Sequence, residues 1–171
     1  AELENAKVAR IKEDLVDAIE PGDWQQCSVL VVAGQLRPEE GKALVALCVQ
    51  MQWPLLADLH SHCGYSQHPL VLTRFGFWLE HEPALDQLKH ADMILQFGVR
   101  LTDKHLQNWL RRNAPKEHWL VAEADHCPDP DQRVSRWINQ AVGQVIASLT
   151  AGSSQRGSID RPLTCWHREL A

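Results

Sequence analysis

Several potential metal ligands lie close together in the middle of the chain. Asp58, His60, His62 and Cys63 fall within six residues, and residues 125–127 add Asp-His-Cys. Carboxylate, imidazole and thiolate groups are the ligands that zinc takes in proteins. A His-x-His pair without a matching distant pair is also common in surface loops, so an ordinary loop is the preferred interpretation. A metal-binding regulatory domain stays open as an alternative, and no metal ligand is assigned.

A second possible chemistry is phosphate binding after the first strong strand. Residues 29–34 read Val-Leu-Val-Val-Ala-Gly, and Pro38 marks the start of a helix. The turn between them is where open α/β sheets place ligands, but a dinucleotide site needs several glycines there. Only Gly34 is present, and Glu39 and Glu40 would repel a phosphate. The sequence therefore favours a structural turn without cofactor-binding residues, with a standalone nucleotide- or flavin-binding module as the alternative.

Lys104 and His105 are the candidate substrate-binding residues. They open the helix expected after the strand that ends at Gly98, and Thr102 or Asp103 would cap that helix. A lysine at a helix N-terminus could attract a carboxylate, whereas a solvated helix face is the simpler interpretation of these residues alone.

No catalytic residue can be assigned. The chain has no Gly-x-Ser-x-Gly nucleophile elbow. Two short basic patches, residues 111–112 and 133–136, are interpreted as solvated faces that could meet an acidic partner.

Alternating strands and helices must position these residues. Strands are expected over 29–34, 53–58, 92–98, 118–123 and 134–138, the last as an edge strand, and helices over 38–51, 82–90, 103–112 and 139–149. This order predicts an α/β fold: a doubly wound, mostly parallel, Rossmann-like sheet of about five or six strands.

Three segments are expected along the chain. Residues 1–27 form an N-terminal lead-in with an amphipathic helix over 2–19, residues 28–150 form the central α/β domain, and residues 151–171 form a tail that begins with a linker over 152–157. The chain starts in mid-pattern without methionine, which suggests a piece of a longer protein.

Composition narrows the class of protein. The 171 residues are 44% hydrophobic with a formal net charge of −5, which argues against nucleic-acid binding. No apolar stretch is long enough for a membrane span. The five cysteines form no Cys-x-x-Cys pair, so reduced thiols in the cytoplasm are expected.

Taken together, four segments resemble a known family. They are Val-Val-Ala-Gly-Gln-Leu-Arg-Pro-Glu-Glu-Gly over 31–41, Gln-Trp-Pro-Leu-Leu-Ala-Asp over 52–58, Gln-Phe-Gly followed by Leu-Thr-x-Lys over 96–104, and Trp-Leu-Val before the acidic loop, over 119–121. In order and spacing they are similar to the middle domain of the MenD family, the thiamine-diphosphate enzymes of menaquinone synthesis (SEPHCHC synthases). The resemblance covers roughly residues 28–150.

The resemblance implies a function for the longer protein. Such an enzyme decarboxylates 2-oxoglutarate and adds the succinyl-semialdehyde unit to isochorismate. Thiamine diphosphate and Mg²⁺ or Mn²⁺ would lie between the N-terminal and C-terminal domains, the expected partners of this chain in a homo-oligomer. The isolated chain would then hold no cofactor and be inactive, serving as scaffold and substrate gate.

The resemblance also bears on the candidate site. Lys104 matches the lysine of the family's Thr-x-Lys-Arg pattern, which implies a contact to a substrate carboxylate. His105 stands where the family has arginine, so bidentate recognition is lost there.

Overall fold

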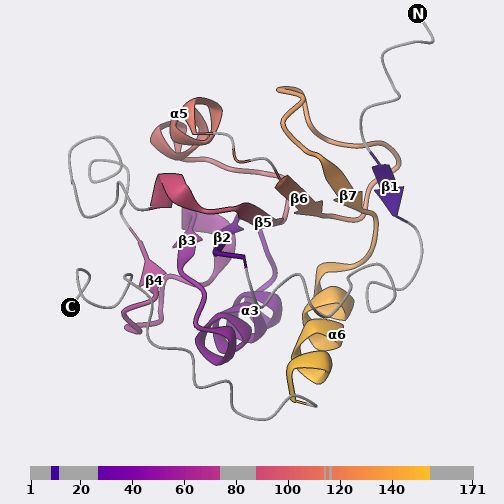
Figure 1. The fold of residues 1–171 in the computed structure, drawn as a ribbon. Helices are drawn as coiled ribbons and strands as arrows, with labels where there is room; N and C mark the ends of the chain where they lie inside the picture. Colours follow the sequence, from indigo (N-terminus) through magenta and orange to yellow (C-terminus); the bar gives the residue numbers. More distant parts are fainter. Residues whose placement is uncertain (1–8, 12–26, 74–87, 114, 116, 155–171) are drawn as a thin grey trace, which may run out of the picture.

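The computed structural model describes residues 9–11, 27–73, 88–113, 115 and 117–154 of the chain. Its centre is a seven-stranded sheet in the order β1-β7-β6-β5-β2-β3-β4, in which every pairing is parallel (Figure 1). The strands are β1 (Ala9–Ile11), β2 (Val29–Ala33), β3 (Leu55–Ala57), β4 (Val71–Leu72), β5 (Met93–Phe97), β6 (Glu117–Val121) and β7 (Arg136–Ile138).

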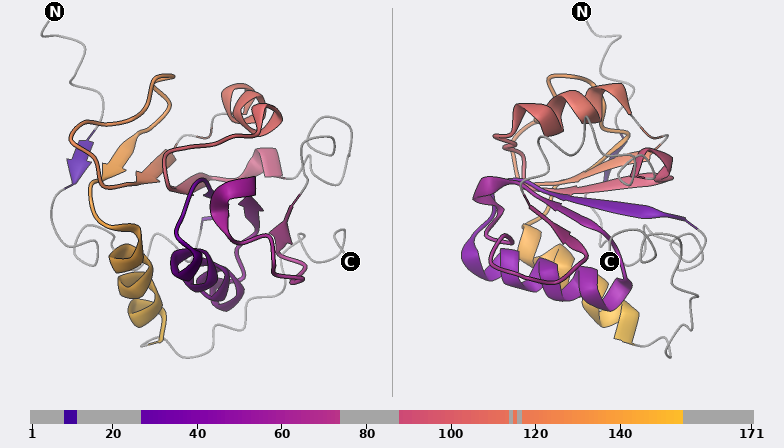
Figure 2. Two further views of the ribbon diagram at one scale, coloured as in Figure 1. Left: turned by 180° about the vertical axis from the view of Figure 1, so that it is seen from behind. Right: turned by 90° about the vertical axis from the view of Figure 1, so that its left-hand side faces the viewer.

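Helices cover both faces of this sheet. They are α3 (Pro38–Met51), α5 (Lys104–Arg112) and α6 (Val142–Ser154), and η2 (Leu59–Ser61) is a single 3₁₀ turn. Figure 2 shows α3 and α6 together on one face and α5 on the other. The predicted doubly wound, Rossmann-like fold is therefore confirmed.

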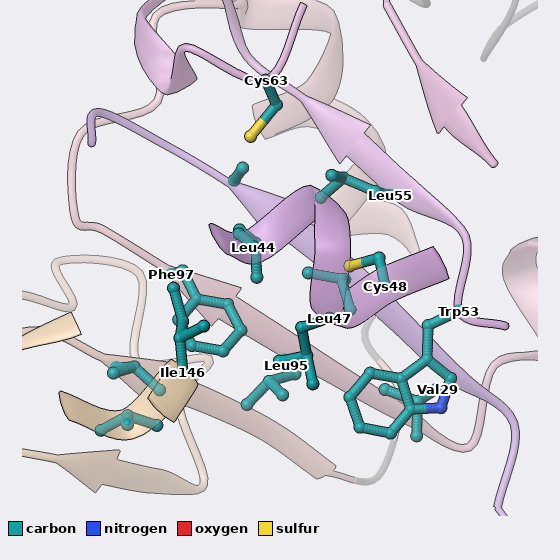
Figure 3. Close-up of a cluster of buried hydrophobic side chains, with 14 of the residues drawn as sticks. Val29, Leu44, Leu47, Cys48, Trp53, Leu55, Cys63, Leu95, Phe97 and Ile146 are labelled. Carbon is teal, nitrogen blue, oxygen red and sulfur yellow. The ribbon is translucent and has the colours of Figure 1, made fainter. Parts of the chain in front are cut away.

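The alternation of side chains along the strands builds one core on each face. Odd-numbered residues of β2 and β5, such as Val29 and Leu95, pack against Leu44 and Leu47 of α3 (Figure 3). Even-numbered residues of the same strands pack beneath α5, in the cluster of Leu30, Val32, Ile94, Leu106, Trp109 and Leu110. Strands that are buried on both faces explain the continuous apolar runs in the sequence.

Two sequence predictions about the edges of the sheet are wrong. Residues 9–11 form β1 instead of part of a helix over 2–19, and the rest of that predicted helix lies outside the described residues. Because β1 pairs in parallel with β7, β7 is an interior strand of a seven-stranded sheet. An apolar stripe in a short segment is compatible with either a helix or a strand. The backbone N–H and C=O groups along the outer side of β7 favour a strand, because a parallel strand can pair with them.

Element boundaries differ elsewhere. The closing helix α6 starts later than expected and remains helical through Ser154, so the expected linker over 152–157 is helical in its described part. The two-residue strand β4 was not predicted. Of the helix expected over 82–90, residues 88–90 form a 3₁₀ turn and the remainder lies outside the described residues.

The topology defines one edge of the sheet as the place for a site. The chain moves outward from β2 to β3 and β4 and then returns to β5 on the other side of β2, so the strand order reverses between β2 and β5. In open α/β sheets, ligands bind at such a reversal, beyond the carboxyl ends of the strands. Three loops meet there, 34–37, 58–62 and 98–103, which are called the carboxyl-edge loops below.

Candidate functional site

The turn after β2 has no free backbone donor for a phosphate. Gly34 N–H donates to Phe97 O (2.8 Å), and Gln35 N–H donates to Arg100 O (2.9 Å). The next two N–H groups donate to His60 O (3.2 Å, from residue 36) and to Glu40 Oε2 (2.9 Å, from residue 37). Phosphate sites at such turns depend on these N–H groups, so nucleotide binding does not fit this turn.

The glycines of this region serve close backbone packing. A Cβ atom on Gly34 would lie 2.8 Å from the carbonyl oxygen of Arg100 and 2.9 Å from that of Gly98. Gly98 has φ +80°, and a Cβ atom there would lie 2.5 Å from the carbonyl oxygen of Gln35. The 98–100 backbone therefore fills the space beside the turn, where a bound phosphate would approach.

The N-terminus of α3 carries its own carboxylate. Glu40 accepts a hydrogen bond from Arg37 N–H and pairs with the Arg37 guanidinium at 2.6 Å. Burial alone would raise the pKa of Glu40, but the hydrogen bonds from Arg37 and its charge outweigh burial, so the pKa lies below its ordinary value. The predicted negative charge at this helix start is present, and it opposes anion binding there.

Asp58 joins the carboxyl-edge loops. The residue is 2% exposed. One carboxylate oxygen accepts from Thr102 N–H (2.8 Å) and Asp103 N–H (3.0 Å), and the other accepts from the Thr102 hydroxyl (2.5 Å) and His60 N–H (3.3 Å). Burial acts to raise the pKa of Asp58, yet these four donors hold it below the ordinary value. Asp58 is thus a structural anion at the point where the strand order reverses.

Lys104 and His105 lie in the first turn of α5, directly beyond this network, and both are exposed. Asp103 caps the helix, as predicted for either Thr102 or Asp103, by accepting from His105 N–H (2.7 Å) and Leu106 N–H (3.1 Å). These donors are therefore engaged by the protein itself. The ammonium group of Lys104 is the feature of this turn that fits a carboxylate ligand.

The potential metal ligands do not converge. His60 and His62 are exposed, whereas Cys63 is 1% exposed and its thiol donates to Gly41 O at 3.5 Å. Asp58 is engaged by backbone and hydroxyl donors, as described above. Among the residues that the structure describes, no group of three or more His, Cys, Asp or Glu side chains could hold a metal ion.

The two basic patches share one acidic residue. The Asp131 carboxylate forms ion pairs with the guanidinium groups of Arg111, at 3.1 Å, and of Arg133, at 3.2 Å. Arg136 lies over the ring of Trp119, 4.7 Å from its centroid. These three arginines are thus engaged within the domain. Arg111 is exposed, as a solvated face requires, whereas the Arg133 side chain is only 15% exposed and does not fit that interpretation.

The sequence indicated other roles for Asp58 and Thr102, as a possible metal ligand and a possible helix cap. Arg100, an exposed residue of loop 98–103 whose carbonyl accepts from Gln35 N–H, was missed. The available signal was position: each of these residues follows the carboxyl end of a strand, and carboxyl ends of parallel strands meet at one edge.

Within the described residues, no helix has the length and apolar character that a membrane span requires.

Comparison with known proteins identifies relatives of the chain. A family model described as "Middle domain of thiamine pyrophosphate" matches residues 6–170. The chain is 37% identical over 148 residues to the 2-succinyl-5-enolpyruvyl-6-hydroxy-3-cyclohexene-1-carboxylate synthase of Yersinia pestis bv. Antiqua (strain Angola). The aligned region covers 86% of this chain and 24% of the relative. The chain is 34% identical over 128 residues to the synthase of the same name from Pectobacterium carotovorum subsp. carotovorum (strain PC1), covering 75% of this chain and 22% of the relative.

The chain therefore spans about a quarter of the length of these relatives. The fold agrees with this match, because the sheet is parallel and is covered by helices on both faces. The match extends over nearly the whole chain, and the chain belongs to the family of thiamine pyrophosphate enzyme middle domains.

Proposed function

We propose that this chain is the middle domain of a SEPHCHC synthase. The longer protein would decarboxylate 2-oxoglutarate and add the succinyl-semialdehyde unit to isochorismate. Two relatives in different genera carry the synthase name at 34% and 37% identity, which supports this reaction. Within the enzyme the domain would act as a scaffold between the other two domains and as part of the substrate entrance.

The exposed ammonium group of Lys104 is the observation that carries the role at the substrate entrance. It lies on the first turn of α5 at the edge of the sheet where α/β proteins bind ligands. The two proposed substrates both carry carboxylates, and an ammonium group is a suitable partner for them. His105 would assist as a hydrogen-bond donor, without the bidentate grip of an arginine.

Turn 34–37 and the start of α3 do not fit thiamine diphosphate. The N–H groups of turn 34–37 are all engaged, Glu40 places a negative charge at the adjacent helix start, and no described cluster could ligate a metal ion. We therefore place the cofactor, with Mg²⁺ or Mn²⁺, in the other domains of the longer protein, where it would supply the decarboxylation and carbon–carbon bond chemistry.

The same proposal covers the partners and the compartment. The partners are the N-terminal and C-terminal domains of the same enzyme, assembled as a homo-oligomer, and the relatives' greater length supports further domains. A cytoplasmic location fits Cys48, Cys63 and Cys127, which are free thiols. The isolated chain should be inactive, because it would lack the cofactor.

The reaction itself is testable with purified proteins. The full-length protein, supplied with thiamine diphosphate, Mg²⁺, 2-oxoglutarate and isochorismate, should consume isochorismate and release CO₂ in equal amounts. The 171-residue chain should do neither under the same conditions. A full-length protein that folds and binds thiamine diphosphate but leaves isochorismate unchanged would contradict the proposal.

The alternative of a standalone nucleotide or flavin module gains no support from the geometry of turn 34–37. FAD, NAD and ADP at millimolar concentration should leave the melting temperature of the chain unchanged. A yellow preparation or a saturable rise in melting temperature would restore that alternative.

A further inference from the structure

We propose that Asp58 is a positioning residue for substrate binding, acting through the loop that carries Lys104. This inference rests on the proposed function of Lys104 at the substrate entrance. Nothing in the residue type of Asp58 alone indicates such a role. It follows from how the backbone and the carboxylate of Asp58 connect three strand ends to the first turn of α5.

The first connection runs from β3 to the loop after β5. Both oxygens of Asp58 reach Thr102: one accepts the Thr102 N–H at 2.8 Å, and the other accepts its hydroxyl at 2.5 Å. The oxygen that accepts Thr102 N–H also accepts Asp103 N–H at 3.0 Å. Three hydrogen bonds to two adjacent residues fix both the distance and the orientation of that peptide segment.

The second connection runs from this loop into α5. Asp103, which is held by Asp58 through its N–H, uses its own carboxylate to cap the helix at His105 and Leu106. Lys104 lies between the held segment and the capped donors, as the first residue of α5. A displacement of residues 102–103 would therefore carry the Lys104 backbone with it.

The third connection anchors Asp58 itself. Its N–H donates to Ala33 O at 2.9 Å, which ties the residue to the end of β2. Its carboxylate accepts from His60 N–H at 3.3 Å, and its carbonyl accepts from the Ser61 hydroxyl at 2.6 Å. The anchor is thus part of the rigid sheet, which is the arrangement that a well-placed binding group requires.

Buried anions with several donors also occur for stability alone, so a control of matched chemistry is needed. Asp92 matches the donor types at the opposite, amino-terminal edge of the sheet, but it is exposed, so the melting temperature is used to account for the difference in burial. One of its oxygens accepts from Ser28 N–H at 2.8 Å and from the Ser28 hydroxyl at 2.9 Å, and thereby joins the starts of β2 and β5. This carboxylate binds a backbone N–H and a hydroxyl as Asp58 does, but it is remote from Lys104.

The variants separate positioning from stability in the full-length protein. Asp58→Asn keeps the shape but replaces one acceptor oxygen by a donor. Thr102→Val removes the hydroxyl donor and keeps the β-branched shape, whereas Thr102→Ser retains the hydroxyl. Asp92→Asn is the control, and Lys104→Ala reports the contact that is being positioned. For each variant, kcat and KM for 2-oxoglutarate and isochorismate are measured together with the melting temperature.

A positioning role gives a specific pattern across these variants. Lys104→Ala should raise KM about tenfold for one substrate with little change in kcat, as expected for loss of one charged contact. Thr102→Val and Asp58→Asn should raise the same KM several-fold, whereas Thr102→Ser and Asp92→Asn should leave it unchanged. Combining Thr102→Val with Lys104→Ala should add little to the effect of Lys104→Ala, because both act on one contact.

Failures of the two proposals look different. If Lys104→Ala raises KM but Thr102→Val and Asp58→Asn behave like Asp92→Asn, the positioning role is overturned and the function of Lys104 stands. If Lys104→Ala leaves both KM values unchanged, the role of Lys104 is overturned and the positioning role falls with it. Should Asp58→Asn fail to fold, the KM values of Thr102→Val and Thr102→Ser separate the same outcomes.

Discussion

Lowering the pH from 7 to 4 should cost the domain about 3 kcal/mol of stability through His118 alone. This side chain is 3% exposed, and its Nε2 lies 3.0 Å from Gln96 Oε1. Because Gln96 Nε2 donates to Gly98 O at 3.0 Å, its oxygen faces the imidazole, whose Nε2 therefore carries the proton. Burial, and then the positive charge of Arg133, lower the pKa of His118 from 6.5 to about 4.

The sign and size of the effect follow from these values. In the unfolded chain His118 takes up a proton near pH 6.5, whereas in the folded domain it stays neutral down to about pH 4. Protonation thus favours the unfolded chain, and stability is lost as the pH falls through this window. The difference of about 2.5 units at 1.36 kcal/mol per unit gives about 3 kcal/mol.

Urea unfolding of the wild type and of His118→Asn at several pH values isolates this effect. Asn cannot titrate in this range but still offers an amide to Gln96. Both proteins have the same carboxylates, so carboxylate titration changes the stability of both equally. The wild type should lose about 3 kcal/mol more than the variant between pH 7 and pH 4. Parallel pH dependences for the two proteins would refute the buried, neutral state of His118.

Two glycine substitutions should act in opposite directions. Gly98→Ala should lower stability by about 1–3 kcal/mol in urea unfolding, because φ is +80° and the added Cβ would lie 2.5 Å from Gln35 O. Gly64→Ala is the control, since its Cβ would have only the Thr73 methyl group nearby, at 3.6 Å. Gly152→Ala should stabilise the domain by up to about 1 kcal/mol and so raise its melting temperature, because Gly152 lies inside α6 with nothing within 4 Å of an added Cβ. A melting temperature that does not rise would contradict helix at this position.

The central strands and α3 could be predicted because local signals and burial agree. Residues 29–33 form an apolar run, and the strand they make is buried on both faces. Pro38 occupies the first position of α3, where its missing N–H costs nothing. By contrast, β1 and β4 are three and two residues long, and pairing with a neighbouring strand creates them. Local sequence carries little information about such pairing.

The candidate site was predictable in position and less so in its internal contacts. The lone glycine and the glutamates argued against a phosphate turn, and in the structure all four N–H groups of that turn are engaged. The partners of Asp58, however, lie 44 and 45 residues further along the chain. Only the crossover of the sheet brings them together, so the sequence showed the residue types without their connection. The substrate contacts of Lys104 and His105 stay a prediction.

The most direct test of the account is steady-state kinetics of the full-length protein with Lys104→Ala beside Lys89→Ala. Lys89 is an exposed lysine that precedes β5 at the opposite edge of the sheet, so it controls for loss of a positive charge. Lys104→Ala should raise KM for 2-oxoglutarate or isochorismate about tenfold with kcat little changed, and Lys89→Ala should match the wild type. Equal KM values for the two variants would contradict a substrate contact at the carboxyl edge of this domain.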